Sequence, residues 1–341
     1  MAVKLKKLRE QVVVVTGASS GIGLATAKMA AKNGAKVLLV ARNEEGLREA
    51  VREIRADGGT AEYVAADVAE LDEMKNVVRA VQEQFGGFDT WVNDAGVSIY
   101  GVIEEVPVAD AKRLFDVNYW GVVHGSLAAL PILKERGGAL INIGSVTSDQ
   151  AIPLQGHYSA SKHAVKAFTD ALRFEVEKEK APVSITLIKP GSIDTPFPEH
   201  ARNYMEAEPK LPPPVYHPDV VAKAILACAE SPRRDVIVGG GGRMTAFLHN
   251  TPKLADVAMK KTQFKGQQMA DVPALADRPD ALYEGQGANE ERGDYPGRVM
   301  RSSAYTTAKL HPVATALGVA ALGVGVALAA RSGLLGMGNG E

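Results

Sequence analysis

Ser145, Tyr158 and Lys162 have the residue types and spacing needed for proton transfer. Tyr158 and Lys162 are four residues apart in the stretch YSASKHAVKAF, whose periodicity predicts a helix, so both side chains should project from one face. A tyrosine hydroxyl titrates at about pH 10 and transfers protons poorly at neutrality unless a nearby cation favours its ionised form. We expect Lys162 to be that cation, and Ser145 to hydrogen-bond a substrate carbonyl beside the phenol. Taken singly, each residue could equally belong to a solvated helix or a turn.

The elements that would position these residues alternate regularly from residue 11 to about 240. Short β-branched runs predict strands at 11–16, 36–41, 61–66, 89–93, 139–144, 184–189 and 235–238. Amphipathic stretches predict helices near 22–33, 44–57, 72–85, 108–135, 157–179 and 218–230. This order predicts an α/β fold, a doubly wound parallel sheet of Rossmann type with about seven strands and a C-terminal extension. Ser145 then follows a strand directly, at the edge where such sheets bind ligands.

A glycine-rich turn, TGASSGIG at 16–23, follows the first predicted strand and opens a helix. Its glycines permit a tight turn, and the helix N-terminus offers free N–H groups to a phosphate. The spacing differs from the common Gly-x-Gly-x-x-Gly fingerprint, so an ordinary strand–helix turn stays open as an alternative. As a cofactor site, the turn would act through Gly17, Ser19, Ser20, Gly21, Ile22 and Gly23.

Arg42, at the end of the second predicted strand, favours NADP(H). An enzyme that uses NAD usually has an acid here for the ribose 2′-hydroxyl, whereas a guanidinium suits a 2′-phosphate. An arginine at this place can also be a solvated surface residue, so NAD(H) stays open. After the third and fourth strands come residues that could contact a cofactor or simply form turns, namely Asp67, Val68, Asn93, Ala95 and Gly96.

In this order and spacing, the motifs resemble the short-chain dehydrogenase/reductase family in its compact branch. The match consists of TGASSGIG at 16–23, NDAG at 93–96, Ser145 thirteen residues before Tyr158, and YSASK at 158–162. Asp94 departs from the asparagine that the family has there. The resemblance covers residues 11 to about 240, and does not explain the last hundred residues.

The resemblance implies hydride transfer between a nicotinamide and an alcohol or ketone, with Tyr158 as general acid or base. It implies that Lys162 binds the nicotinamide ribose and lowers the pKa of Tyr158, and that Asn118 holds a water linking Lys162 to solvent. Tyr158 and Lys162 would thus also contact the cofactor, together with Pro190, Gly191, Ile193 and Thr195. A homodimer or homotetramer is expected. Two alternatives remain open: a non-catalytic NADP(H)-binding sensor or scaffold, and another chemistry such as epimerisation or dehydration.

The stretch 192–217, with six prolines between a strand and a helix, predicts a mobile lid over the substrate. Phe197, Tyr204 and Met205 could line an apolar pocket or pack the loop. Thr147 and Gln155 could touch substrate or belong to surface turns. We expect His157 to be structural.

Net charge, the number of cysteines and the spacing of histidines exclude several classes of function. A net charge of −1, from 39 basic and 40 acidic side chains, provides no field to attract nucleic acid. The single cysteine, Cys228, excludes an internal disulfide, and the histidines show no metal-ligand spacing. The basic N-terminus lacks the apolar run of a signal peptide, so we expect a cytoplasmic protein that acts on a small alcohol or carbonyl compound.

The C-terminal part has its own pattern. We expect the oxidoreductase domain to comprise 1–242, followed by a helical extension at 243–270, with a helix near 244–264, and a polar linker at 271–312. The uncharged stretch 313–330 would form a helix of about 27 Å, close to the bilayer core of about 30 Å. Because it is rich in Ala and Gly, a membrane anchor and a helix packed on protein are both left open.

Overall fold

The computed structural model describes residues 3–240, 252–275, 278–286, 289–311 and 315–316. Its centre is a parallel sheet with the strand order β12-β7-β6-β4-β1-β2-β3. The strands are β1 (Val12–Thr16), β2 (Lys36–Ala41), β3 (Thr60–Ala65), β4 (Thr90–Asn93), β6 (Gly138–Ile143), β7 (Val183–Pro190) and β12 (Asp235–Val238). The sheet confirms the predicted fold class. Strand order reverses between β1 and β4, which places a ligand crevice beyond the carboxyl ends of these strands.

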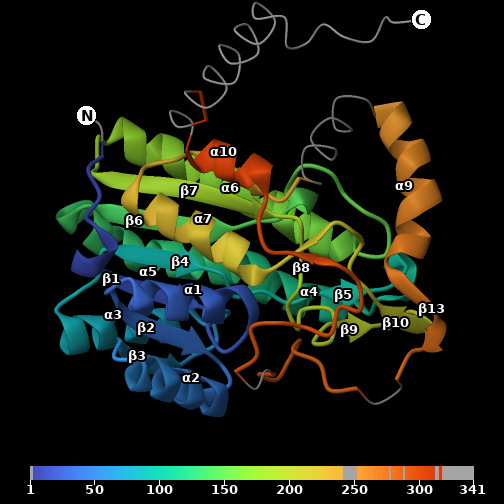
Figure 1. Cartoon of the computed structure of the whole chain (residues 1–341), viewed down its shortest axis with the longest axis horizontal. Helices are drawn as coiled ribbons and strands as arrows, with labels where there is room; N and C mark the ends of the chain where they lie inside the picture. Colours follow the sequence, from blue (N-terminus) through green and yellow to red (C-terminus); the bar gives the residue numbers. More distant parts are fainter. Residues whose placement is uncertain (1–2, 241–251, 276–277, 287–288, 312–314, 317–341) are drawn as a thin grey trace, which may run out of the picture.

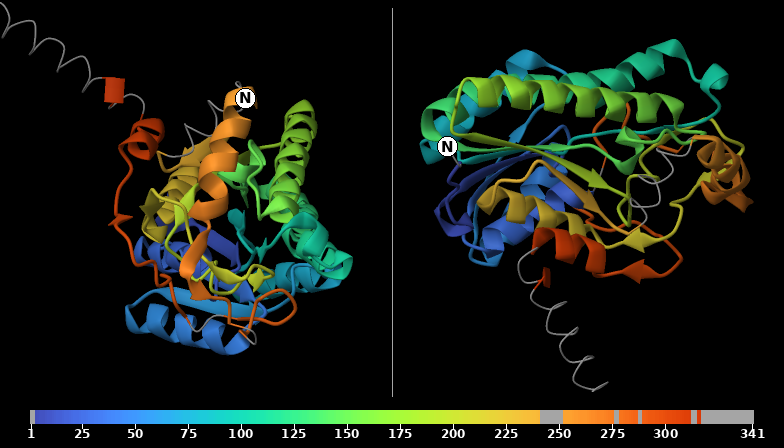
Figure 2. Two further views of the ribbon diagram at one scale, coloured as in Figure 1. Left: turned by 90° about the vertical axis from the view of Figure 1, so that its right-hand side faces the viewer. Right: turned by 90° about the horizontal axis from the view of Figure 1, so that it is seen from above.

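Helices cover both faces of the sheet, as Figures 1 and 2 show. One layer contains α1 (Gly21–Lys32), α2 (Glu44–Ala56) and α7 (Pro218–Glu230); the other contains α3 (Leu71–Phe85), α4 (Val108–Phe115), α5 (Gly121–Arg136) and α6 (Gly156–Lys178). All five residues of β1 are buried, because a parallel sheet covered on both sides excludes water from every strand position. Apolar clusters lie under both helical layers.

The lid at 192–217 is tied to the C-terminal part of the chain by small sheets. In the lid, β8 (Ser192–Ile193) and β11 (Val215–Tyr216) form a sheet with β14 (Val299–Met300). β10 (Ala207–Pro209) pairs antiparallel with β13 (Gln268–Pro273), and β9 (Arg202–Asn203) pairs with β5 (Ile99–Tyr100). These backbone pairings differ from the free, mobile loop expected from the prolines.

Several described residues of the polar linker expected at 271–312 make defined contacts with the domain, although many others are exposed. Helix α9 (Pro252–Gly266) stands at the edge of the molecule and leads into β13, and α10 (Ala304–Leu310) packs on α7. Leu282 is fully buried, and Arg278 hydrogen-bonds the carbonyls of Pro198 and Ala201 in the lid (3.1 and 3.2 Å). Charged side chains that suggest a solvated linker instead find partners on the lid.

The membrane-anchor prediction falls on 313–330, which lies outside the described residues except for 315 and 316. Among the described residues, none of the helices has the length and apolar character required to cross a bilayer.

Candidate active site

A cavity of about 930 Å³ opens beyond the carboxyl ends of β1, β4, β6 and β7. Its wall includes three of the four predicted catalytic residues, Ser145, Tyr158 and Lys162, and all three predicted substrate residues, Thr147, Gln155 and Phe197. Most predicted cofactor residues also line it: Gly17, Ser19, Ser20, Gly21, Ile22, Arg42, Asp67, Val68, Ala95, Gly96, Pro190, Gly191, Ile193 and Thr195. The sheet therefore gathers residues from seven sequence regions into one site.

The glycine-rich turn has the close approaches that require glycine. Gly17 has φ +71°, and a Cβ there would lie 2.8 Å from the Cα of Ala95. Gly23 does not line the cavity, in contrast to its predicted role at the cofactor. A Cβ on Gly23 would lie 2.3 Å from the carbonyl oxygen of Gly17, so this glycine lets helix α1 begin directly against the turn.

Arg42 and Asp67 lie at the far end of the cavity, beyond β2 and β3. The Arg42 guanidinium donates to the carbonyls of Leu282 and Tyr283 (3.4 and 3.1 Å) and to that of Ala281. One Asp67 oxygen accepts from the Ala69 amide (2.9 Å), and the other accepts from the Arg113 guanidinium. Arg42 therefore lines the cavity, and some of its N–H groups are hydrogen-bonded to backbone carbonyls of the C-terminal residues 281–283.

Tyr158 sits on the first turns of α6 and hydrogen-bonds Ser145, which follows β6. Burial raises the pKa of Tyr158 to about 12, against the lowering effect of the Ser145 hydrogen bond. Burial therefore dominates the pKa of Tyr158 in this structure, and a lowering of that pKa by Lys162 stays a prediction. The phenol is protonated at neutral pH, the form that can donate a proton.

Lys162 lies one helical turn from Tyr158, with Nζ 5.8 Å from the centre of the tyrosine ring. The ammonium donates to the carbonyl of Ile143 at the end of β6 (2.9 Å). Burial lowers the pKa of Lys162 to about 8, and the carboxylate of Asp94 opposes this effect. Burial also raises the pKa of Asp94 to about 7, while Lys162 and the Gly23 amide act in the other direction. Asp94 and Lys162 thus shift each other's pKa, and this acid stands at the position where the motif of the resembled family has asparagine.

Asn118 is fully buried in a π-helical turn, Asp116–Trp120, between α4 and α5. This turn divides the single helix predicted at 108–135, and π-turns often occur at functional sites. The Asn118 side chain accepts from the Val97 amide (2.8 Å) and donates to the Val97 carbonyl (2.9 Å) and to Ser161 Oγ (3.1 Å). Asn118 does not line the cavity. Instead it fixes the chain after β4 to α6, the helix that carries Tyr158 and Lys162.

Asn93 was predicted to contact the cofactor, but its side chain belongs to a buried network. It accepts from Trp91 Nε1 (2.8 Å) and donates to Ser126 Oγ (3.1 Å) and Asn142 Oδ1 (2.8 Å). Asn93 is absent from the cavity wall. Buried polar groups need partners, and this amide supplies them between β4, α5 and β6. These buried hydrogen bonds account for an asparagine at position 93 of the NDAG motif without a contact to a cofactor.

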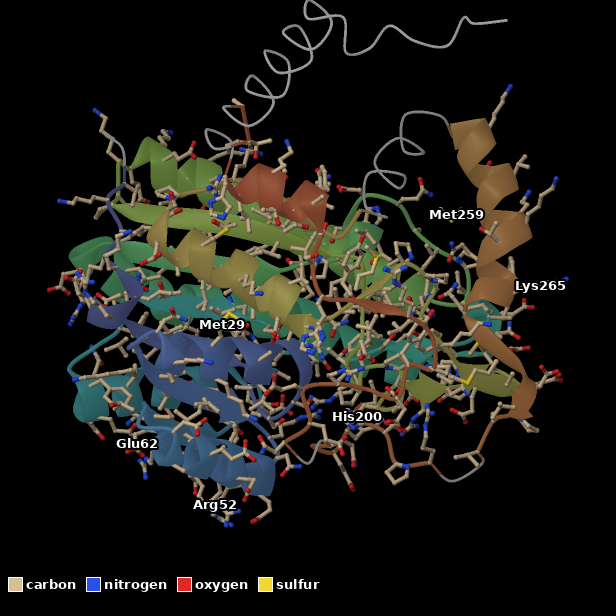
Figure 3. The ribbon with its side chains drawn as sticks, viewed as in Figure 1. Met29, Arg52, Glu62, His200, Met259 and Lys265 are labelled. Atoms are coloured by element: carbon tan, nitrogen blue, oxygen red, sulfur yellow. The ribbon has the colours of Figure 1, made fainter. Side chains whose placement is uncertain are left out.

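The substrate end of the cavity includes residues that sequence reasoning missed. Helix α9 contributes Met259, labelled in Figure 3, together with Thr262, Gln263 and Gly266, and Gln267 follows the helix. Phe197 of the lid packs against the Tyr158 ring, with ring centres 5.7 Å apart. The sequence at 244–264 indicated a possible helix, but no local motif linked it to Tyr158, about a hundred residues earlier in the chain.

Two lid residues considered for an apolar pocket, Tyr204 and Met205, do not line the cavity, and neither does His157. The Tyr204 hydroxyl hydrogen-bonds Asp110 on α4. Among the described residues, no group of His, Cys, Asp and Glu side chains has the arrangement of a metal site.

Comparison with known proteins supplies independent information. The sequence model described as short chain dehydrogenase matches residues 11–206. The uncharacterized oxidoreductase YxnA of Bacillus subtilis is 44% identical over 323 residues, covering 94% of this chain and 90% of that protein. An uncharacterized oxidoreductase of Staphylococcus epidermidis is 38% identical over 196 residues, covering 57% of this chain and 83% of that protein.

Two solved structures are similar to this fold. The L-sorbose reductase of Gluconobacter frateurii, complexed with NADPH and L-sorbose, has a TM-score of 0.60 and 27% identity, covering 70% of this chain and 98% of that one. The alcohol dehydrogenase of the archaeon Thermococcus sibiricus, complexed with 5-hydroxy-NADP, has a TM-score of 0.59 and 27% identity, covering 67% and 95%.

Proposed function

Because the chain belongs to the short-chain dehydrogenase family of oxidoreductases, we propose that it reduces a ketone or aldehyde to an alcohol with NADP(H), with Tyr158 as the general acid. The observation that carries this proposal is the hydrogen-bonded pair of Tyr158 and Ser145 on the cavity wall, with Lys162 one helical turn away. The reverse oxidation would use the same residues.

The cavity fits a nicotinamide dinucleotide. A Cβ at Gly17 would collide with backbone, so the turn permits close approach, and the N-terminus of α1, the end of a helix that favours a phosphate, lines the cavity. Arg42 would hold the 2′-phosphate of NADP(H), and Lys162 the hydroxyls of the nicotinamide ribose. When bound, the cofactor supplies the hydride. The two solved neighbours with NADPH and 5-hydroxy-NADP support this choice over NAD(H).

The proton chemistry belongs to residues of this chain. A phenol with a pKa of about 12 remains protonated at neutral pH, so Tyr158 can donate its proton to a carbonyl oxygen. Ser145 would orient that carbonyl beside the phenol. Asn118 contributes by holding α6 in place, since its side chain bridges Val97 and Ser161. The structural role of Asn118 is compatible with a water-mediated proton route, which stays a prediction.

The experiment is a comparison of Tyr158→Phe with the wild type on a panel of ketones and aldehydes, following loss of reduced nicotinamide absorbance. We expect Tyr158→Phe to lose at least about a thousandfold in kcat while the Kd for NADPH changes less than about threefold, because only the proton donor is removed. Tyr63→Phe is the matched control, since the Tyr63 hydroxyl contacts exposed Glu44 (3.2 Å). Equal turnover by wild type and Tyr158→Phe would refute the assignment. Tight NADPH binding without turnover on any carbonyl would favour a non-catalytic binding protein instead.

A further inference from the structure

The C-terminal segment, residues 278–294 apart from 287 and 288, runs along the rim of the cofactor end of the cavity. Three of its residues, Ala281, Gly285 and Gln286, line the cavity itself. The segment contacts Arg42 beyond β2, then the glycine-rich turn, then the start of the lid. In Figure 1 it is the orange-red stretch that crosses below the small sheets. Residues far from the predicted cofactor motifs therefore share their site.

The contact with Arg42 is made entirely by backbone carbonyls. Nη1 donates to the carbonyls of Leu282 (3.4 Å) and Tyr283 (3.1 Å), and Nη2 donates to that of Ala281. A guanidinium has five N–H groups. The hydrogen bonds that Arg42 donates to described residues use three of these groups, so two N–H groups remain for a ligand. Carbonyl acceptors carry no formal charge, so they fix the guanidinium without neutralising it. An anion at the same place would still meet a full positive charge and two donors.

The segment is anchored to the domain at points outside the cleft. Leu282 is fully buried, and its carbonyl also accepts from Arg113 Nε (3.1 Å). The Tyr283 hydroxyl donates to Asp110 on α4 (2.8 Å), and Asp280 pairs with Arg202 of the lid (2.6 Å). These contacts give the carbonyls at 281–283 a defined position, which a free chain end would lack.

Further along, the segment reaches the phosphate-binding turn and the lid. The Gly21 amide donates to the Glu290 carbonyl (2.8 Å), and Arg292 Nε donates to the buried Asp194 (2.7 Å). At the Arg42 end, Gly285 lies so close to the chain after β2 that a Cβ would be 2.7 Å from the Asn43 amide nitrogen. Any side chain at 285 must push the segment away from Arg42.

We propose that this C-terminal segment is part of the dinucleotide site and positions Arg42 for the 2′-phosphate of NADP(H). The proposal rests on the proposed function, which assigns Arg42 to that phosphate. The backbone carbonyls of 281–283 are the positioning groups, and the segment thereby sets the preference for NADP(H) over NAD(H). NADH lacks the 2′-phosphate, so its binding does not depend on how Arg42 is held.

The test is fluorescence titration of NADPH and NADH into the full chain carrying Gly285→Ala. We expect the Kd for NADPH to rise about tenfold or more, the effect of losing a well-aligned charge-assisted contact, while the Kd for NADH changes less than about twofold. Gly297→Ala is the matched control in the same C-terminal stretch, because its Cβ would meet only the movable ring of Tyr295. Gly297→Ala should leave both Kd values unchanged. Tyr283→Phe, which loosens an anchor outside the cleft, should weaken NADPH binding selectively by about twofold to fivefold and serves if Gly285→Ala fails to fold.

Two results would overturn the inference: an equal rise in both Kd values, which would make the segment a general cover, or no change in either. Arg42→Ala separates this failure from that of the proposed function. If Arg42→Ala weakens NADPH selectively but Gly285→Ala and Tyr283→Phe do not, Arg42 binds the phosphate without help from the segment. If the wild type shows no preference for NADPH over NADH, the proposed cofactor assignment itself fails.

Discussion

The assignment of Asn93 to the sheet, and not to the cofactor, gives a sharp prediction about Asn93→Ala. Truncation leaves three buried groups without this amide: Trp91 Nε1, Ser126 Oγ and Asn142 Oδ1. A buried polar group that loses its partner costs about 1–3 kcal/mol. Because Asn142 also donates to Thr169 (3.0 Å), part of the network persists, and the lower half of that range applies. Three groups at about 1–2 kcal/mol each give a loss of about 3–6 kcal/mol in the free energy of unfolding.

The assay is urea denaturation followed by far-ultraviolet circular dichroism, which avoids the fluorescence of Trp91 beside the mutated residue. Exposed Asn76→Ala on α3 is the control and should change the free energy of unfolding by less than about 0.5 kcal/mol. The Kd of folded Asn93→Ala for NADPH should stay within about threefold of the wild type, since the side chain does not line the cavity. A stability loss below about 1 kcal/mol together with markedly weaker NADPH binding would refute the reasoning and restore Asn93 to the cofactor site.

Two further predictions concern pH. The rate of alcohol oxidation should increase as pH rises from about 7 to 10, because oxidation needs ionised Tyr158, whose pKa burial raises to about 12. The rate of carbonyl reduction should fall above about pH 8, because Lys162 then loses its charge. Rates that do not change with pH in either direction would contradict this prediction. Asp94→Asn should raise Tm more at about pH 8 than at about pH 5. The pKa of Asp94 is about 7 in the fold against about 4 unfolded. Between these pH values the unfolded chain releases this proton while the buried carboxyl keeps it, so the wild type loses stability as pH rises and the variant does not. Thermal melts with an equal gain at both pH values would argue against a buried Asp94.

The bounds of the strands could be predicted from the sequence almost residue by residue. Short β-branched runs such as Val12–Val15, followed by a glycine-rich turn, are typical of fully buried strands. That Ser145 and most residues predicted to bind the cofactor line one cavity followed from the same logic, since residues after parallel strands must meet at one edge. Tyr158 was predicted instead from its helical spacing to Lys162. The π-turn at Asn118 could not be predicted, because the helical periodicity continues through it. The raised pKa of Tyr158 could not be foreseen, because burial, which no local sequence pattern reveals, outweighs the neighbouring hydrogen bond.

The C-terminal part was misread for a different reason. Proline, glycine and charge normally indicate a solvated linker, yet Asp280 and Arg278 have partners on the lid, and Leu282 is buried in a core formed mainly by earlier residues. These contacts join positions seventy residues or more apart, so periodicity and composition carry no trace of them. The hydrogen bonds from Arg42 to backbone carbonyls could not be predicted either, because every residue type has a backbone carbonyl.

The C-terminal segment that contacts Arg42 is synthesised after the rest of the domain, which affects the order in which parts of the protein can fold. A ribosome releases the N-terminal strands first, and domains generally start to fold as they emerge. The central sheet, from β1 to β12, is complete once residue 238 is available, so a folded core can form during translation. The carbonyls that meet Arg42 and Gly21 lie at 281–283 and 290. A nascent chain would thus complete the central sheet before it has the carbonyls that we propose to position Arg42.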